Sequence, residues 1–415
     1  MTQKVVILST GDELTTGKVV DTNSATIADG LFAIGLKVVA VLKVGDDRGQ
    51  LLWALDQARA SGDLIIGTGG LGPTADDLTT ETVATFLGRN LEQDEEVAAD
   101  LKRRFASRRL AWTLNNLKQA QFPQGAVIIP NPAGTAPGFR VAIGQNKTLI
   151  WLSGVPQEMH RMLQETVIPW IAQQTGAQQQ FLSCTFKLHG LTESKLDEML
   201  KPLDASPHAK LSFRAHYPDL SLRLIVDGGR EQEPLFTALR RQIAAILGTH
   251  VYAQSDATLE EVVGQMLRER HYSLALAESC TGGYISRRVT RIAGSSAYFY
   301  GGAVTYSNDA KIRFLGVNPE TLEKHGAVSQ ETALEMSCGI RNKTGASIGL
   351  SVTGIAGPAG GSPEKPVGTV WMSIDWDYGH EARLFQFHGD RERVIVGASQ
   401  AALYWLRIQL LSQKQ

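Results

Sequence analysis

The alternation of short apolar runs with helical patterns near the start of this chain is the feature that most restricts its fold. Residues 4–9, 37–44 and 63–67 are apolar runs typical of buried strands. Helical patterns at 23–35 and 49–61 separate these runs. Strands that alternate with helices form parallel sheets that are covered on both faces. The pattern therefore predicts an α/β chain that begins with a doubly wound domain, in which ligands bind at the carboxyl ends of the strands.

Length and composition narrow the class of protein. A chain of 415 residues corresponds to two to four domains. The formal net charge of -1 gives no broad basic field for nucleic acid or for an anionic membrane. The 3 cysteines are scattered without CxxC spacing, which excludes a disulfide framework and favours a reducing compartment. Because no run of about 18 apolar residues occurs, we expect a cytoplasmic protein that neither spans membranes nor binds nucleic acid.

The loops that follow the first and third predicted strands carry polar groups suited to a ligand. Thr10–Glu13 and Asp21–Asn23 follow the first strand, and Thr68–Asp77 follows the third. Backbone N–H groups of a glycine-rich turn can hold a phosphate, while Asp76 or Asp77 can hold a divalent cation. The alternative is that these aspartates cap the next helix. We favour a phosphate or nucleotide site, whereas Asp46 and Asp47 are interpreted only as helix caps.

The middle of the chain predicts a small α+β domain without a catalytic cluster. Residues 181–252 give a strand, a helix, two strands and a helix, an order that is similar to a KH-type RNA module. However, residues 227–230 are not a GxxG clamp, and basic and acidic residues alternate here. His189, His208 and His216 lack metal-ligand spacing and are interpreted as structural. We therefore expect a spacer or an oligomerisation domain.

A serine turn and two later loops make the last part of the chain a candidate catalytic domain. Ser279 follows an apolar run at 273–277 and precedes two glycines and a helical pattern. This position suits a nucleophile, an anion site or a helix cap. Lys311 follows the next predicted strand in the first turn of a helix, where the dipole and partial burial would lower its pKa. A neutral lysine can act as the general base for a serine hydroxyl, although most lone lysines are surface charges.

Longer motifs resemble known families. GDELTTGKVVDTN, TGGLGPTADDLT, PNPAGTAPG and LSGVPQEM resemble the molybdopterin-binding fold of molybdenum-cofactor biosynthesis proteins. AESCTGG, VTYSNDAK, SVTGIAGPAGGSPEKPVGTV and GDR resemble the nicotinamide-nucleotide amidase domain. Together they resemble the competence/damage-inducible CinA family, which implies a molybdopterin-binding-like domain at 1–172, a KH-like domain at 178–252 and an amidase domain at 256–415.

The resemblance implies a bifunctional pyridine-nucleotide enzyme. The C-terminal domain would hydrolyse the carboxamide of nicotinamide mononucleotide without a cofactor, and the N-terminal domain would cleave ADP-ribose to AMP and ribose 5-phosphate with a divalent metal. The resemblance also implies a homodimer. The alternatives are that only the amidase is active, with the N-terminal domain as a nucleotide- or pterin-binding scaffold, or that the chain is a nucleotide sensor without catalysis.

The family motifs carry over to individual positions. The catalytic residues would be Ser279 as nucleophile, Lys311 as base and Tyr306 as its assistant. The amidase substrate would be bound by Gly282, Gly283, Thr353, Gly354, Gly357 and Arg391, the last of which would take the phosphate. The N-terminal nucleotide site would comprise Glu13, Asn23, Thr68, Gly69 and Gly70, with Asp76, Asp77 and Asp21 as metal ligands.

Two positions depart from the family pattern, and a third offers an alternative nucleophile. The family pattern often repeats an arginine four residues after Arg391, where this chain has Ile395, and Arg393 is a candidate substitute. Ser153 stands where the family usually has proline. Cys280 is a rival nucleophile, because a helix N-terminus lowers the pKa of a thiol.

Overall fold

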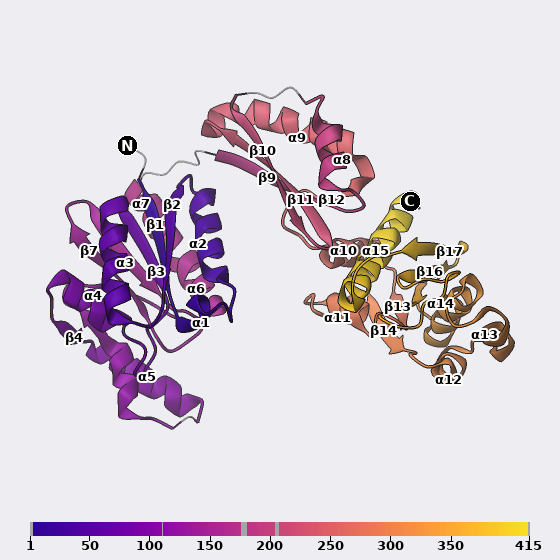
Figure 1. The fold of residues 1–415 in the computed structure, drawn as a ribbon, viewed down its shortest axis with the longest axis horizontal. Coiled ribbons are helices and arrows are strands. Elements are labelled where there is room, and N and C mark those ends of the chain that lie inside the picture. Colours follow the sequence, from indigo (N-terminus) through magenta and orange to yellow (C-terminus); the bar gives the residue numbers. More distant parts are fainter. Residues whose placement is uncertain (1–2, 110, 176–180, 204–206, 414–415) are drawn as a thin grey trace. The chain divides into compact units, whose positions relative to one another are not determined.

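The computed structural model describes residues 3–109, 111–175, 181–203 and 207–413, which divide into two compact units (Figure 1). One unit comprises Met1–Leu182 with Asp227–Glu233, and the other comprises Ser183–Val226 with Pro234–Gln415. The first unit holds the N-terminal domain. The second holds most of the small middle domain and the C-terminal domain.

The N-terminal domain is built on a mixed sheet with the strand order β2-β1-β3-β8-β7-β6. Neighbours from β2 to β8 are parallel, and β7 and β6 add antiparallel strands. The strand bounds are β1 Val5–Thr10, β2 Val38–Val44, β3 Leu64–Thr68, β6 Val127–Ile129, β7 Gly138–Gly144 and β8 Lys147–Leu152, with β4 Leu91–Gln93 and β5 Gln121–Pro123 paired separately. The helix bounds are α1 Asp12–Thr15, α2 Thr22–Ala33, α3 Arg48–Ser61, α4 Thr79–Leu87, α5 Glu95–Ser107, α6 Pro156–Met162 and α7 Ile168–Thr175.

Both faces of this sheet are buried, as the unbroken apolar strands predict. Successive residues of β1 point to opposite sides, so Val6 joins one hydrophobic cluster and Val5 joins another. Helix α3 contributes to the first cluster, and α2 and α6 contribute to the second. The doubly wound architecture is thereby confirmed, and the predicted strands at 4–9, 37–44 and 63–67 correspond to β1, β2 and β3.

The middle domain is a sheet with the strand order β10-β11-β9-β12, accompanied by two helices. Its elements are β9 Phe181–Leu188, α8 Glu193–Leu200, β10 Ala209–His216, β11 Asp219–Asp227, α9 Glu233–Leu247 and β12 Val251–Ala253. The first five elements follow the predicted α+β order, and the structure adds the short strand β12, which was not predicted and which pairs with β9.

The C-terminal domain has a sheet with the strand order β14-β13-β15-β16-β17, in which β13 is parallel to β14 and β15. The later pairs are antiparallel. The strand bounds are β13 Leu274–Glu278, β14 Phe299–Val304, β15 Ile348–Gly354, β16 Thr369–Trp376 and β17 Gly379–Gln386. The helix bounds are α10 Leu259–Glu269, α11 Tyr284–Thr290, α12 Asn308–Ala310, α13 Pro319–His325, α14 Gln330–Thr344 and α15 Arg391–Ser412, with a π-helical turn at Lys311–Leu315.

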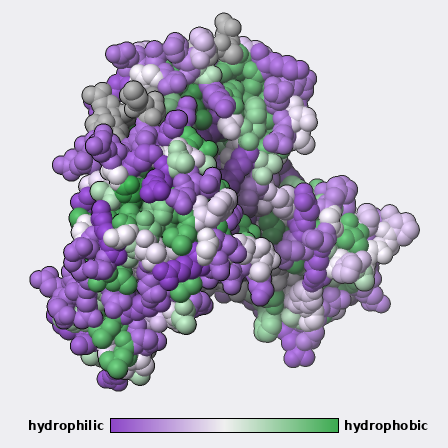
Figure 2. Space-filling view, turned by 60° about the vertical axis from the view of Figure 1, so that its left-hand side comes forward, coloured by the Kyte–Doolittle hydropathy of each residue, from purple (hydrophilic) through white to green (hydrophobic). Residues whose placement is uncertain are grey.

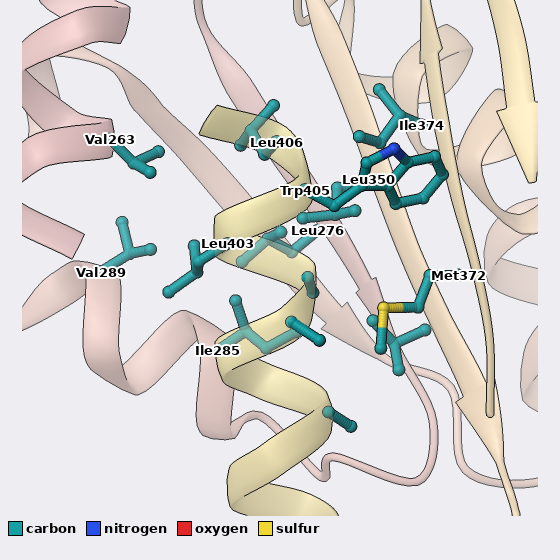
Figure 3. Packing of buried hydrophobic residues seen from close by; sticks show 14 of the residues in the cluster. Val263, Leu276, Ile285, Val289, Leu350, Met372, Ile374, Leu403, Trp405 and Leu406 are labelled. Atoms are coloured by element: carbon teal, nitrogen blue, oxygen red, sulfur yellow. The ribbon is translucent and has the colours of Figure 1, made fainter. Parts of the chain in front are cut away.

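Helix α15 forms one side of the C-terminal core. Leu403 and Leu406 lie toward Val263 of α10 and Val289 of α11, while Trp405 lies against the sheet (Figure 3). This helix is long and apolar enough to cross a membrane by length and composition, yet 67% of its most apolar window is buried inside the fold. The apolar residues of α15 are therefore those of a helix that packs inside the domain core. Hydrophilic residues dominate the face of the molecule shown in Figure 2.

Candidate functional site

The carboxyl ends of three parallel strands bring the predicted C-terminal site residues to one sheet edge. Glu278 at the end of β13 pairs with Val304 of β14 and with Val352 of β15. The turn that begins at Ser279 therefore lies between the loops that follow β14 and β15. The backbone N–H of Ser279 donates to the Val352 carbonyl over 2.9 Å, which fixes the start of this turn.

Lys311 and Ser279 meet at the centre of this edge. Lys311 Nζ donates to Ser279 Oγ over 3.0 Å and to the Thr305 carbonyl over 2.8 Å. Only 1% of Lys311 is exposed, and no acidic partner accompanies these two acceptors among its described hydrogen bonds. Burial lowers the pKa of Lys311 below its usual 10.5, because the charged amine loses its hydration. The structure thus brings together the predicted nucleophile and base.

Ser307 caps the short helix α12 before Lys311, but Ser279 caps no helix. Helix α11 begins only at Tyr284, and its N-cap residue is Gly283. The carboxylate of Glu278 replaces the missing cap side chain. It accepts the N–H groups of Gly283, Ile285 and Ser286 over 2.8–3.1 Å and the Ser286 hydroxyl over 2.6 Å. The helix-cap alternative for Ser279 is therefore wrong, and its hydroxyl is left for Lys311.

Glu278 is a site residue that the sequence analysis missed. It is 1% exposed and ends a strand whose other residues are apolar. A carboxylate at the end of a buried apolar run, directly before a turn that contains two glycines, is the signal that could have identified it. The lowered pKa expected for the rival nucleophile Cys280 is also wrong, since burial raises the pKa of its thiol to about 12. A thiol in this state is a poor nucleophile near neutral pH.

Tyr306 and Arg391 meet at the surface beside the Ser279–Lys311 pair. Arg391 Nη2 donates to the Tyr306 hydroxyl over 2.6 Å, and its Nη1 donates to the Gly357 carbonyl over 2.7 Å. Tyr306 is 60% exposed. Tyr306 directly follows Thr305, whose carbonyl accepts Lys311 Nζ, so its hydrogen bond brings Arg391 to the same part of the site. Tyr306 is therefore hydrogen-bonded to the predicted phosphate anchor. The described hydrogen bonds of Lys311 Nζ do not include Tyr306, so they give no direct support to its expected role as assistant to the base.

The remaining predicted substrate residues lie at the end of β15 and in the turn after Ser279. The hydroxyl of Thr353 is buried and donates to the Ala327 carbonyl over 2.7 Å, so it holds two loops together. Gly354 ends β15, where a Cβ atom would lie 2.7 Å from the Thr369 carbonyl oxygen. Gly282 and Gly283 both have positive φ, at 60° and 92°, which the tight turn after Ser279 requires.

The two positions expected to affect phosphate binding have other contacts. Ile395 packs against the C-terminal core. The guanidinium of Arg393 lies 4.2 Å from the ring centroid of Tyr217 in the middle domain. The structure gives Arg393 this partner, so the suggestion that it replaces a second phosphate-binding arginine finds no support in its contacts.

All the predicted N-terminal site residues line one cleft of about 450 Å³. The loops after β1 and β3, the start of α2 and Gly154–Pro156 form its walls. Gly69 has φ 106°, and a Cβ atom there would lie 2.3 Å from the Thr10 carbonyl oxygen. The amide of Asn23 donates to Thr68 Oγ1 and to the Gly154 carbonyl. Asn23 and Thr68 thus hold the floor of the cleft together.

The cleft carboxylates differ in their availability to a metal. Asp21 caps α2 through Ser24 and forms an ion pair of 3.3 Å with Lys43, so it does not fit as a ligand. Asp77 accepts both the N–H and the hydroxyl of Thr74. Within the described residues, no group of three or more His, Cys, Asp or Glu side chains is placed to hold a metal ion. Asp76 and Asp77 retain the hard oxygen donors that divalent cations prefer.

Three predictions about helix caps in this domain have different outcomes. Asp47 caps α3 as predicted, since its side chain accepts the N–H of Gln50. Asp46 does not act as a cap: it lines the cleft and accepts the N–H of Asp12. Burial, together with the charges of Asp12 and Glu13, raises the pKa of Asp46. Helix α4 begins after Leu78 without a side-chain cap, so neither Asp76 nor Asp77 caps it.

Ser153, which stands where the family usually has proline, makes hydrogen bonds that hold its loop in place. Its hydroxyl donates to Glu158 Oε2 over 2.8 Å, and its carbonyl accepts the Thr68 hydroxyl over 2.8 Å. These bonds fix the loop between β8 and α6.

Comparison with known proteins finds family resemblance along the whole chain. The CinA C-terminal domain matches residues 256–410, the probable molybdopterin binding domain matches 6–173, and the damage-inducible protein CinA KH domain matches 183–253. A CinA-like protein from Geotalea uraniireducens is 42% identical over 414 residues, which are 99% of this chain and 98% of that protein. A putative competence-damage inducible protein from Moorella thermoacetica is 42% identical over 97% of this chain and 98% of its own length. The crystal structure of a CinA superfamily protein from Klebsiella pneumoniae covers 38% of this chain and all of its own, with 36% identity and a TM-score of 0.37.

We predict that Glu278→Ala destabilises the C-terminal domain by about 1–3 kcal/mol, because buried N–H groups at the start of α11 lose their acceptor. Native-state hydrogen exchange of the β13 amides measures this change. Glu323→Ala, on the exposed side of α13, is the matched control and should change stability by less than about 0.5 kcal/mol. Equal effects of the two substitutions would contradict the capping role.

Proposed function

The chain belongs to the CinA family of competence/damage-inducible proteins, and on that premise we propose that its C-terminal domain hydrolyses the carboxamide of nicotinamide mononucleotide to nicotinate mononucleotide and ammonia. The observation that carries the proposal is the buried Lys311 amine, 3.0 Å from Ser279 Oγ. A serine that only caps a helix or only binds a ligand needs no desolvated lysine beside it. A nucleophilic serine needs a base of this kind.

Amide hydrolysis proceeds in two halves in this proposal. Ser279 Oγ attacks the carboxamide carbon while its proton passes to neutral Lys311 Nζ. When the C–N bond breaks, Lys311 returns that proton to the departing nitrogen, which leaves as ammonia. Water then attacks the acyl-serine ester and gives a proton to Lys311. The C–Oγ bond breaks, nicotinate mononucleotide leaves as the acid, and the Lys311 proton restores the Ser279 hydroxyl.

The turn after Ser279 supplies donors for the negative charge of the tetrahedral intermediate. The N–H groups of Gly282 and Gly283 donate to Ser279 O and Glu278 Oε2. We assign the N–H groups of Cys280 and Thr281 to the oxyanion, because they lie in the same turn as the nucleophile. Backbone donors fixed in this way stabilise the developing charge without reorganisation. The Thr305 carbonyl holds Lys311 Nζ near Ser279 throughout.

Arg391 and Tyr306 are proposed to bind the phosphate of the substrate. Hydrogen bonds to the Tyr306 hydroxyl and the Gly357 carbonyl hold the Arg391 guanidinium at the surface. A guanidinium has five N–H groups, so others remain to donate to a phosphate. A guanidinium can contact two phosphate oxygens at once. Tyr306 would orient the arginine in this arrangement and add a hydroxyl donor to the phosphate.

We further propose that the N-terminal domain cleaves ADP-ribose to AMP and ribose 5-phosphate. The support is a cleft that is lined both by Gly69 and Gly70, which have positive φ, and by several carboxylates. Such a loop can take a pyrophosphate on its N–H groups. Asp76 and Asp77 would hold a divalent cation, whose chemistry would be the neutralisation of pyrophosphate charge. A scaffold without turnover is the alternative for this domain, and a nucleotide sensor without turnover is the alternative for the whole chain.

Ammonia release from nicotinamide mononucleotide tests the amidase proposal. Ser279→Ala should lower kcat by at least ~1,000-fold, because the acyl-enzyme can no longer form. Cys280→Ala is the matched control one residue away and should retain kcat within a few-fold. Full activity of Ser279→Ala, loss of activity only in Cys280→Ala, or no ammonia from the unaltered protein would each contradict the mechanism.

The pH dependence of kcat/KM tests the role of Lys311. The neutral amine is the form that accepts the serine proton, so kcat/KM should rise with pH through the Lys311 pKa. The rise should be centred below 10.5, because burial lowers that pKa. Lys311→Met should remove the activity across this range. A profile that falls with pH, or one centred at or above 10.5, is incompatible with Lys311 as the base.

AMP formation from ADP-ribose with added divalent metal tests the N-terminal proposal. Asp76→Ala should abolish AMP formation, while Asp56→Ala, on the exposed face of α3, should retain it. Nicotinamide mononucleotide hydrolysis serves as an internal control and should be equal in both variants. AMP formation that survives Asp76→Ala would remove this residue from the site, and its absence in the unaltered protein would favour the scaffold alternative.

A further inference from the structure

One face of α15 is a stripe of residues that contacts the middle domain. The positions are three or four residues apart, so they lie on the same side of the helix. They are Arg393, Gly397, Gln400, Tyr404 and Arg407. The core face of the same helix packs against the C-terminal sheet and against α10 and α11 (Figure 3). Helix α15 is therefore shared by the middle and C-terminal domains.

Tyr217 is the middle-domain residue that contacts the first turns of α15. It lies in the turn between β10 and β11. Its hydroxyl donates to the Arg393 carbonyl over 2.8 Å, and its ring lies 4.2 Å beneath the Arg393 guanidinium. A Cβ atom at Gly397 would lie 2.1 Å from the Tyr217 hydroxyl oxygen. The absence of a side chain at Gly397 thus permits the close approach.

A polar network continues this contact into the interior. Asp219, two residues after Tyr217, accepts the Gln400 amide over 2.5 Å and the Tyr252 hydroxyl over 2.9 Å. Gln400 in turn accepts Arg288 Nη2 over 2.6 Å, and the same nitrogen bonds Glu260 over 2.7 Å. The side chains of Arg288 and Glu260 are about nine-tenths buried. Buried networks of this kind hold one relative arrangement of their elements, because any displacement leaves polar groups unpaired.

Two further side chains of α15 bind the middle domain at the C-terminal end of the stripe. The Tyr404 hydroxyl and Arg407 Nη1 both donate to the Thr249 carbonyl, and Arg407 Nη2 donates to the Val251 carbonyl over 2.7 Å. The middle domain thus contacts α15 near its start, at its centre and toward its end. Arg391 is the first residue of this helix, two positions before the carbonyl that Tyr217 binds.

We propose that the middle domain positions the phosphate-binding Arg391 through the contact of Tyr217 with the first turn of α15. Tyr217 is then a positioning residue: it touches no substrate and acts through the helix that carries Arg391. The inference rests on the proposed amidase function of the C-terminal domain. It assigns the middle domain a part in recognition of the nucleotide phosphate.

Comparison of two substrates in the full-length chain tests the proposal. Tyr217→Ala should raise KM for nicotinamide mononucleotide about tenfold with kcat unchanged, since a hydrogen bond and a cation–π contact are lost. KM for nicotinamide riboside, which lacks the phosphate, should not change. Tyr217→Phe keeps the ring and should give a smaller rise. Tyr378→Ala, at the exposed turn between β16 and β17, is the matched control and should leave both KM values unchanged.

An equal rise in KM for both substrates, a fall in kcat alone, or no change in Tyr217→Ala would overturn the proposal. Hydrogen exchange separates its failure from failure of the proposed function. Amides at 394–398 and at 354–361 should exchange faster in Tyr217→Ala than in the unaltered protein, whether or not either substrate is hydrolysed. If the unaltered protein releases no ammonia, the amidase function fails, and unchanged exchange in that case would also overturn the positioning role.

Discussion

The burial of the Lys311 amine against Ser279 and Thr305 is the interaction on which the candidate amidase site depends. A buried ammonium ion without a carboxylate partner is costly, and the cost is reduced when the group gives up its proton. In the part of the chain that the structure describes, the hydrogen-bond acceptors of Lys311 Nζ are one hydroxyl and one carbonyl. Loss of hydration disfavours the charged form of Lys311. The neutral amine that results can accept the proton of the adjacent Ser279 hydroxyl.

The surrounding fold keeps this pair together with its proposed ligand groups. Parallel pairing of β13 with β14 and β15 places three loops at one edge. Glu278 satisfies the start of α11, which leaves Ser279 free to face Lys311. On the other side, α15 begins at Arg391 and is held between the C-terminal core and the middle domain. The pair and the arginine thus belong to elements whose positions are set by different contacts.

Much of the fold could be predicted from the sequence because its signals are local. Apolar runs identified β1, β2 and β3 closely, and the strand, helix, two strands and helix predicted within 181–252 occur in that order as β9, α8, β10, β11 and α9. The approximate position of Lys311 after β14 was also predictable from the motif. The cap alternative for Ser279 and the lowered pKa expected for the rival nucleophile Cys280 were wrong, because both assumed that α11 begins at once after the strand. Helix α11 begins instead after two glycines with positive φ.

By itself the sequence determined the kinds of element, their order and the residue types available at each strand end, since periodicity and turn chemistry are properties of neighbouring residues. The tertiary structure decided which of these residues meet. Ser279 and Lys311 are 32 positions apart, and Tyr217 and Arg393 are 176 apart. It also decided the extent of burial at Lys311, and with it the charge state that this residue favours. Desolvation and contacts between remote segments exist only once the chain has packed, and no local pattern encodes them.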